Sequence, residues 1–248
     1  MRNSYFRAIV LVIGLSLSGM AHAECVDANV EAAFRRLDMP ALQHMIDDAL
    51  AQSSLDPMAA AVLGLAAYRE AMLLERNAQG SAAQSLITEV TDRIDPIRAK
   101  TSDEDVTAIM SMLYGLEIAI SPVRGFYLGR KVQRIFDAAQ TGGRQNPRLR
   151  LAQGLSLLYR PKLFGGGPQN AIPDLDAAIA GFDPRLPTES SICWGLADAM
   201  LALARARIAL REWPLAITLV NAVAARDPQN PMAQWMRDEL RRGAAGDH

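Results

Sequence analysis

Residues 102–120, SDEDVTAIMSMLYGLEIAI, show most clearly the pattern on which a fold prediction for this chain rests. An acidic start, suited to capping a helix and to the helix dipole, is followed by large apolar residues at spacings of three and four. This period is typical of an α-helix with one buried face. The apolar positions are Val106, Ile109, Met110, Leu113, Leu116 and Ile120.

The same pattern recurs along the chain, and no convincing alternating strand interrupts it. Ser121-Pro122 ends this helix and starts an antiparallel neighbour that Gly142-Gly143 closes. Starts of further helix pairs recur about every 45 residues, which indicates a repeat. The sequence therefore predicts an all-α fold, a right-handed α-solenoid of antiparallel helix pairs over residues 24–242, with residues 243–248 as a disordered tail. The predicted starts are Asp56, Asp103, Asn146 and Thr188 to Ser190, with a final helix from Asn230-Pro231 to Arg241-Arg242.

Composition excludes several classes of protein. The chain has 248 residues, of which 50% are hydrophobic and 21% charged, so it is too apolar for intrinsic disorder. A formal net charge of -1 excludes a nucleic-acid binder that works through bulk positive charge. Only three His occur, which excludes a His-rich metal site, and no cofactor is expected. His44 belongs to an ordinary amphipathic helix, so we expect no His-dependent nucleophile.

The first 23 residues have the order of a secretory signal peptide. Arg2 and Arg7 precede an apolar run, and Ala21-His22-Ala23 is the small-x-small pattern that a signal peptidase accepts. We expect cleavage after Ala23 and a periplasmic or secreted protein. The run is shorter than the about 20 apolar residues of a membrane span, so no stable span is expected after cleavage. An uncleaved anchor is the alternative.

The two cysteines, Cys25 and Cys193, leave two possibilities open. In an oxidising compartment they could form a disulfide, which would stabilise the fold by about 4 kcal/mol on the loop-entropy model. An elongated fold would hold them apart, whereas a bond needs Cα atoms within about 7 Å. Two independent thiols, with Cys193 buried as a small apolar residue, are the default expectation.

The C-terminal unit has the most diagnostic residues. Glu212-Trp213-Pro214-Leu215-Ala216 precedes Asp227-Pro228, and Ala204 supplies a second small residue on the preceding helix. This segment resembles the second helix of a tetratricopeptide (TPR) repeat, and the stretch from Gly166 to Ala171 resembles another. The resemblance covers about residues 146–240 and implies a TPR-like exported α-solenoid. Before residue 146, HEAT-like or degenerate TPR pairs are both open.

Two sets of basic residues are candidate binding groups. Arg160, Lys162 and Phe164 precede three glycines in a loop that opens a helix, where backbone N–H groups can bind an anion. A nucleotide site is excluded because no Gly-Lys-Ser/Thr follows and no strand precedes the loop. The alternative is an inter-helix loop with glycines at positive φ and Phe164 in the core. Arg207 and Arg211 share a helix face that suits an acidic peptide or a carboxylate, or is simply solvated.

Stacked helix pairs without an active-site pattern predict a non-enzymatic protein. We expect an exported interaction or scaffold protein of the bacterial cell envelope, which binds a partner protein or peptide on its helical-repeat surface. One alternative is an accessory ligand-binding protein for a solute uptake system, by resemblance to the periplasmic TPR proteins that accompany TRAP-type systems. Another is a carrier of a small apolar ligand. An enzyme would need buried acidic residues in a cluster, and the sequence shows none.

Overall fold

The computed structural model describes residues 25–140, 146–182 and 194–246, and within these ranges the chain is entirely helical. This confirms the predicted all-α class. The predicted signal peptide lies outside the described residues. The α-helices are α1 (Ala28–Arg35), α2 (Met39–Leu50), α3 (Pro57–Arg76), α4 (Gly80–Thr101), α5 (Glu104–Ile120), α6 (Gly125–Gln140), α7 (Pro147–Tyr159), α8 (Pro168–Gly181), α9 (Leu196–Ala209), α10 (Trp213–Arg226) and α11 (Pro231–Gly246), and the 3₁₀ turns are η1 (Pro122–Arg124) and η2 (Lys162–Phe164).

Most helix starts lie where the sequence predicts them, because capping is local. The side chains of Asp56, Asp103 and Asn146 each accept a hydrogen bond from a backbone N–H in the first turn of α3, α5 and α7. Asn230 accepts from the Ala233 N–H at 3.0 Å and caps α11 in the same way. A side-chain oxygen thus satisfies a donor that the helix itself cannot.

One predicted helix end is wrong, and one predicted start is not described. The start predicted at Thr188 to Ser190 lies outside the described residues, within which α9 begins at Leu196, directly after Gly195 at φ 123°. At the other end, α11 continues through Gly246, past the end predicted at Arg242 and into the predicted tail.

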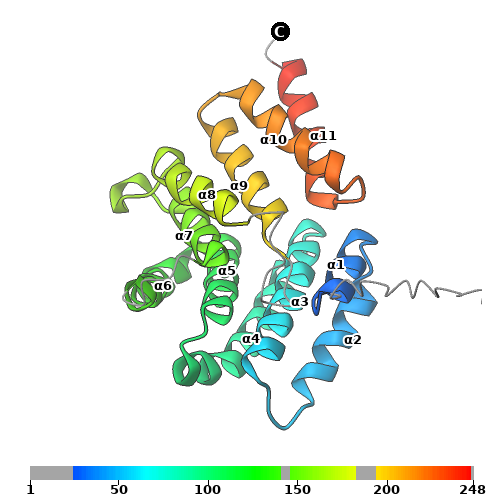
Figure 1. The fold of residues 1–248 in the computed structure, drawn as a ribbon, viewed down its shortest axis with the longest axis vertical. Coiled ribbons are helices and arrows are strands. Elements are labelled where there is room, and N and C mark those ends of the chain that lie inside the picture. Colours follow the sequence, from blue (N-terminus) through cyan, green and yellow to red (C-terminus); the bar gives the residue numbers. More distant parts are fainter. Residues whose placement is uncertain (1–24, 141–145, 183–193, 247–248) are drawn as a thin grey trace, which may run out of the picture.

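Consecutive helices pack as antiparallel pairs. α3 contacts α4, α5 contacts α6, α7 contacts α8 and α9 contacts α10, while α3, α5 and α7 also contact one another in sequence. Figure 1 shows these pairs following one another around the molecule. Ala204 and Ala216, the small residues of the TPR resemblance, are both fully buried where α9 and α10 meet. Small side chains at this point let the two helices approach closely.

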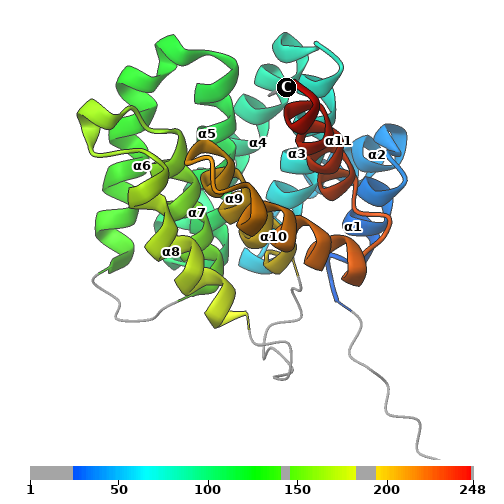
Figure 2. The ribbon, with the colours of Figure 1, turned by 90° about the horizontal axis from the view of Figure 1, so that it is seen from above.

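The first and last helices of the chain meet. Both ribbon views place α1 beside the turn between α10 and α11 (Figures 1 and 2). Phe34 of α1 makes an edge-on contact with Trp235 of α11, with ring centroids 6.3 Å apart. Arg76 of α3 lies over the same Trp235 ring at 4.2 Å. The succession of helix pairs therefore curves back until its two ends touch.

Among the described residues, one helix is long and apolar enough to cross a membrane by composition. It is α3, with 20 residues and a mean hydropathy of 1.3 in its most apolar window, and 72% of that window is buried inside the fold. Two charged residues on it, Arg69 and Glu70, are buried as well. Helices on several sides therefore cover α3, which explains why its sequence is apolar around most of its circumference.

Glu70 makes the stability dependent on pH. Burial, and secondarily the charge of Asp47, raise the pKa of the Glu70 carboxyl to about 7 from an ordinary 4.5. Between these two values the folded chain binds more protons than the unfolded chain, so the free energy of unfolding falls as pH rises. We expect Glu70→Gln to be about 1–2 kcal/mol more stable than the parent at pH 8, and much closer to it at pH 5.

Urea unfolding at the two pH values measures this difference. Asp48→Asn is the control, because the Asp48 side chain is 67% exposed on the same helix as Asp47. An equal effect of Glu70→Gln at both pH values would contradict the assignment.

Candidate functional site

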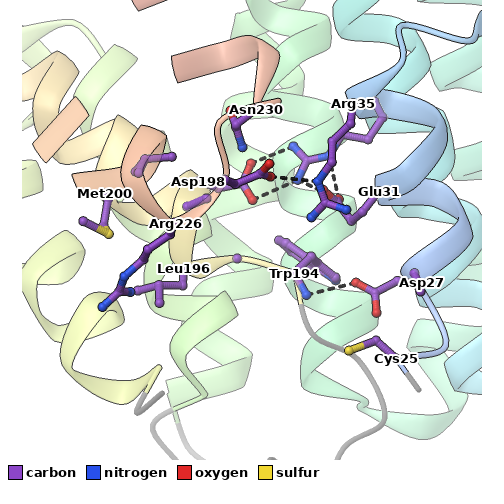
Figure 3. Close-up of a pocket in the computed structure, with 16 residues that line it drawn as sticks. Cys25, Asp27, Glu31, Arg35, Trp194, Leu196, Asp198, Met200, Arg226 and Asn230 are labelled. Carbon is purple, nitrogen blue, oxygen red and sulfur yellow. Dashed lines mark hydrogen bonds and ion pairs between the residues drawn. The ribbon is translucent and has the colours of Figure 1, made fainter. Parts of the chain in front are cut away.

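A cavity of about 350 Å³ lies where the two ends of the chain meet. Its walls come from α1, from the start of α9 and from the turn between α10 and α11 (Figure 3). The wall combines charged side chains with apolar ones. The lining residues are Cys25, Asp27, Ala28, Glu31, Arg35, Arg69, Trp194, Gly195, Leu196, Ala197, Asp198, Met200, Val223, Arg226, Asp227 and Asn230.

Arg69 is the central charge in this wall. Its Nη1 donates to Asp198 Oδ1 at 2.6 Å and its Nη2 to Asp198 Oδ2 at 2.9 Å, so the pair is bidentate. Its Nε donates to Glu31 Oε1 at 2.9 Å. Arg69 is 3% exposed and Asp198 5%. One guanidinium from α3 therefore joins α1 to α9, and of the two acids that it binds Asp198 is buried while the Glu31 side chain is 17% exposed.

Burial sets the protonation of this triad. Desolvation alone would lower the pKa of Arg69, but the charges of Asp198 and Glu31 outweigh it and raise that pKa. Burial raises the pKa of Glu31, against the opposing charge of Arg69. The Phe34 ring, whose centroid lies 4.8 Å from the guanidinium carbon, covers Arg69 further. Arg69 is thus a permanent cation, held by the two carboxylates.

Further polar contacts join the two ends of the chain around the cavity. Arg35 Nε donates to Asp227 Oδ2 at 2.8 Å, which connects α1 to the residue after α10. The Trp194 backbone N–H donates to Asp27 Oδ2 at 2.9 Å. Arg148 of α7 holds the other side of Trp194, since its Nε donates to the Trp194 carbonyl at 3.0 Å. These contacts position the loop before α9 against the start of α1.

Cys25 is disulfide-bonded, so the expectation of an independent thiol at this position is wrong. The physical reason is the meeting of the chain ends, because Asp27 holds Trp194 directly. Cys193, the other cysteine of the chain, lies outside the described residues. Its pairing with Cys25 stays a prediction.

The acids of the cavity wall are largely committed, whereas three donor groups are not, among them the buried Trp194 Nε1, which has no partner in the described chain. Each of Asp27, Glu31, Asp198 and Asp227 accepts a hydrogen bond from a protein donor. Among the described residues the Arg226 guanidinium has no ion pair, and in Figure 3 it points away from the ion-pair cluster. Asn230 uses its oxygen as the cap of α11, which leaves its amide N–H₂ for a ligand. Such a wall suits binding rather than proton transfer.

The described residues offer no group of three or more His, Cys, Asp or Glu side chains that could hold a metal ion. His44, in particular, is exposed on α2 beside Asp48. Nothing in the described part of the chain therefore assigns a metal to this cavity.

The binding residues predicted from the sequence lie elsewhere. Arg160, Lys162 and Phe164 lie in and beside η2, between α7 and α8, and Arg207 and Arg211 lie at the end of α9. None of the five lines the cavity. Arg207 forms an ion pair with Glu212 at 2.7 Å, which makes it a poor anchor for a carboxylate.

The loop between α7 and α8 differs in one respect from its sequence-based interpretation. Gly165 and Gly167 do adopt positive φ, at 76° and 113°. Phe164, however, is 65% exposed and does not enter the core. The turn folds back on itself at Gly166, where a Cβ would collide with the Arg160 carbonyl, and Phe164 in the same turn stays at the surface.

None of the charged residues of the cavity was predicted from the sequence as a binding group. The sequence offered one indication of these residues, namely a charged residue inside an otherwise apolar helix. Arg69 interrupts the apolar helix 57–76, and Asp198 interrupts the Ala/Leu-rich helix that follows Trp194. A charge in such a position has to find a buried partner. The identity of that partner is not local information.

No protein-family model and no curated protein matches the chain. A solved structure similar to it is that of HusA, a haemophore from Porphyromonas gingivalis, with a TM-score of 0.59 and 22% sequence identity. The match covers 77% of this chain and 95% of the haemophore chain. The two proteins share a fold. At this identity the likeness extends to the helical architecture alone.

We expect Arg69→Met to lower the free energy of unfolding by about 3–5 kcal/mol, because it leaves two largely buried carboxylates without their cation. Adding Asp198→Leu should recover part of this loss. Urea unfolding of the four members of this cycle measures the coupling. Arg205→Met is the control, since Arg205 and Glu239 are 38% and 45% exposed and their pair should contribute less than about 1 kcal/mol. Equal losses for Arg69→Met and Arg205→Met would contradict a buried triad.

If Cys25 pairs with Cys193, then Cys25→Ser, Cys193→Ser and the double variant should all lose the same stability, about 2–5 kcal/mol. Losses that add in the double variant would exclude the pair. Peptide mapping without reductant should recover one linked peptide that contains both residues, and reductant should separate it.

Proposed function

We propose that this protein is an exported carrier that binds a small molecule in the cavity between α1, α9 and the α10–α11 turn, without catalysing a reaction. The observation that supports this most directly is the cavity itself. Its volume of about 350 Å³ lies in the range of ligand sites. It is also formed jointly by the two ends of the chain.

The chemistry of the wall favours an amphipathic ligand. Leu196, Met200 and Val223 offer apolar contact, while Arg226 and Asn230 offer donors that are not committed to protein partners. A ligand with an apolar body and an acceptor group, such as a carboxylate, would match both. Because the acids already have donors, none is poised to act as a general base.

The fold shared with a haemophore supports the carrier function and makes haem the first ligand to test. Haem iron takes His, Cys, Met or Tyr ligands. Of these, Met200 is the side chain that the described cavity wall offers, because Cys25 is disulfide-bonded. Haem would therefore bind through Met200 or through its propionates alone. A flat macrocycle also needs the cavity to widen.

Export and a repeat architecture belong to the same proposal. The signal-like residues 1–23 and the oxidised Cys25 both suit a periplasmic or secreted protein. Successive helix pairs support a TPR-like solenoid. A protein or peptide partner on an open curve, as predicted from the sequence, has less support, because contacts between α1, α3 and α11 close that curve.

Titration of the protein with hemin, followed by its Soret absorption, tests the carrier function. Ala28→Trp should fill the cavity, since Ala28 is half-buried in its wall. Asn29→Trp is the matched control, because Asn29 is the exposed neighbour outside the wall. We expect the control to keep the parent affinity and Ala28→Trp to lose at least about tenfold.

Native mass spectrometry of the purified protein covers ligands other than haem. A co-purifying small molecule that Ala28→Trp loses and Asn29→Trp keeps would support the carrier function with a different ligand. The carrier function would be overturned if the protein bound no hemin and carried no such molecule. It would also be overturned if the two variants behaved alike.

A further inference from the structure

The outward face of α6 exposes large apolar side chains that no other part of the described chain covers. Val123 in η1 is 73% exposed, Phe126 80% and Tyr127 55%. The spacing of three and four places them on one stripe of the helix. Arg130 and Arg134 continue the same stripe and are exposed. The buried stripe of α6, from Leu128 to Phe136, faces the opposite way.

The turn between α7 and α8 forms a second projection of the same kind. Leu163 is 88% exposed and Phe164 65%, and the exposed Lys162 precedes them. In both ribbon views this turn and α6 lie at the same edge of the molecule, away from the meeting chain ends (Figures 1 and 2). We call the two projections together, residues 123–134 and 160–164, the α6 edge.

The α6 edge is basic as well as apolar. Arg130, Arg134 and Lys162 form no ion pair within the described residues, and the guanidinium of Arg160 donates only to the Ser156 hydroxyl. Asp137 is the carboxylate that follows them on the outward face of α6, and its Oδ1 accepts from Gln133. Free cations therefore outnumber acids beside exposed aromatic rings.

We propose that the α6 edge docks the protein on the surface of an anionic lipid bilayer. Phe, Tyr and Leu side chains would enter the headgroup region, where aromatic residues are favoured, and the cations would contact lipid phosphates. This assignment is independent of the cavity and of what the cavity binds.

The shape of the edge favours lipid over a protein partner. The exposed apolar residues belong to two separate segments, the start of α6 with η1 before it and the η2 turn, and are 55% to 88% exposed. A protein would need a separate pocket for each segment, whereas a fluid bilayer accepts both without prior complementarity. The cations beside these segments add attraction to any anionic lipid, which falls as salt rises.

Vesicle flotation tests the proposal. The protein, purified from the envelope of cells that express the full chain, is mixed with phosphatidylcholine vesicles and with vesicles in which roughly one-third of the lipid is phosphatidylglycerol. Two apolar variants, Phe126→Ser/Tyr127→Ser and Leu163→Ser/Phe164→Ser, are compared with the parent. The control is Leu215→Ser/Ile217→Ser, which removes side chains 50% and 45% exposed on α10, outside the residues that define the edge. All variants have the same N-terminus, so any contribution from it cancels.

We expect the parent to bind the anionic vesicles and both apolar variants to lose at least about tenfold in partition coefficient, with the control unchanged. Arg130→Gln/Arg134→Gln should weaken the preference for phosphatidylglycerol, and circular dichroism should show all variants folded. A parent that does not float with anionic vesicles, or a control that loses as much as the α6 variants, would overturn the proposal. Failure of the parent to float would leave the edge to a protein partner. An equal loss in the control would indicate non-specific adsorption.

Discussion

Much of the structure depends on one buried cation. A guanidinium placed inside an apolar helix is tolerable only if carboxylates surround it, and Arg69 finds Asp198 and Glu31 on two other helices. Separating any one of these three groups from the others would leave a charge without its partner away from water. The triad therefore fixes the positions of α1, α3 and α9 relative to one another. The aromatic contact between Phe34 and Trp235 adds apolar burial at the same junction. The cavity exists because these contacts bring the chain ends together while leaving space between them.

The proposed carrier function is consistent with how the acids of the cavity wall are engaged. Catalysis by carboxylates needs an acid or base that is free to exchange a proton with a ligand, whereas the acids here are engaged by protein donors. Polar contacts in the wall fix its shape, and the residual donors and apolar side chains give it selectivity. The outer edge at α6 has a different character, with exposed rings and cations that form no ion pair within the described residues, so the two proposed roles fall on separate surfaces.

The sequence allowed the helices to be predicted, but not the way the chain ends meet. Caps and first-turn prolines are local, so the starts at Pro57, Glu104 and Pro147 could be placed from neighbouring residues. The start predicted near Ser190 lies outside the described residues, and Leu196 could not be placed as a helix start because Gly195 before it offers no capping side chain. Phe164 was expected in the core because large apolar residues usually are. The partners of Arg69 could not be found at all, since no local pattern indicates which distant helix it meets.

The long sequence separation across the junction has a consequence for how the chain reaches its native state. Arg69 and Asp198 are 129 residues apart, and Arg35 and Asp227 are 192 apart. A growing chain can form α1 to α4 early, since α1 packs against α2 and α3, yet the ion pairs that join Arg69 and Arg35 to Asp198 and Asp227 wait for the last helices. Until then Arg69 lacks its Asp198 partner, and the side of α1 that meets α11 is open to chaperones and proteases. α1 is therefore made early but is among the last helices to complete its contacts.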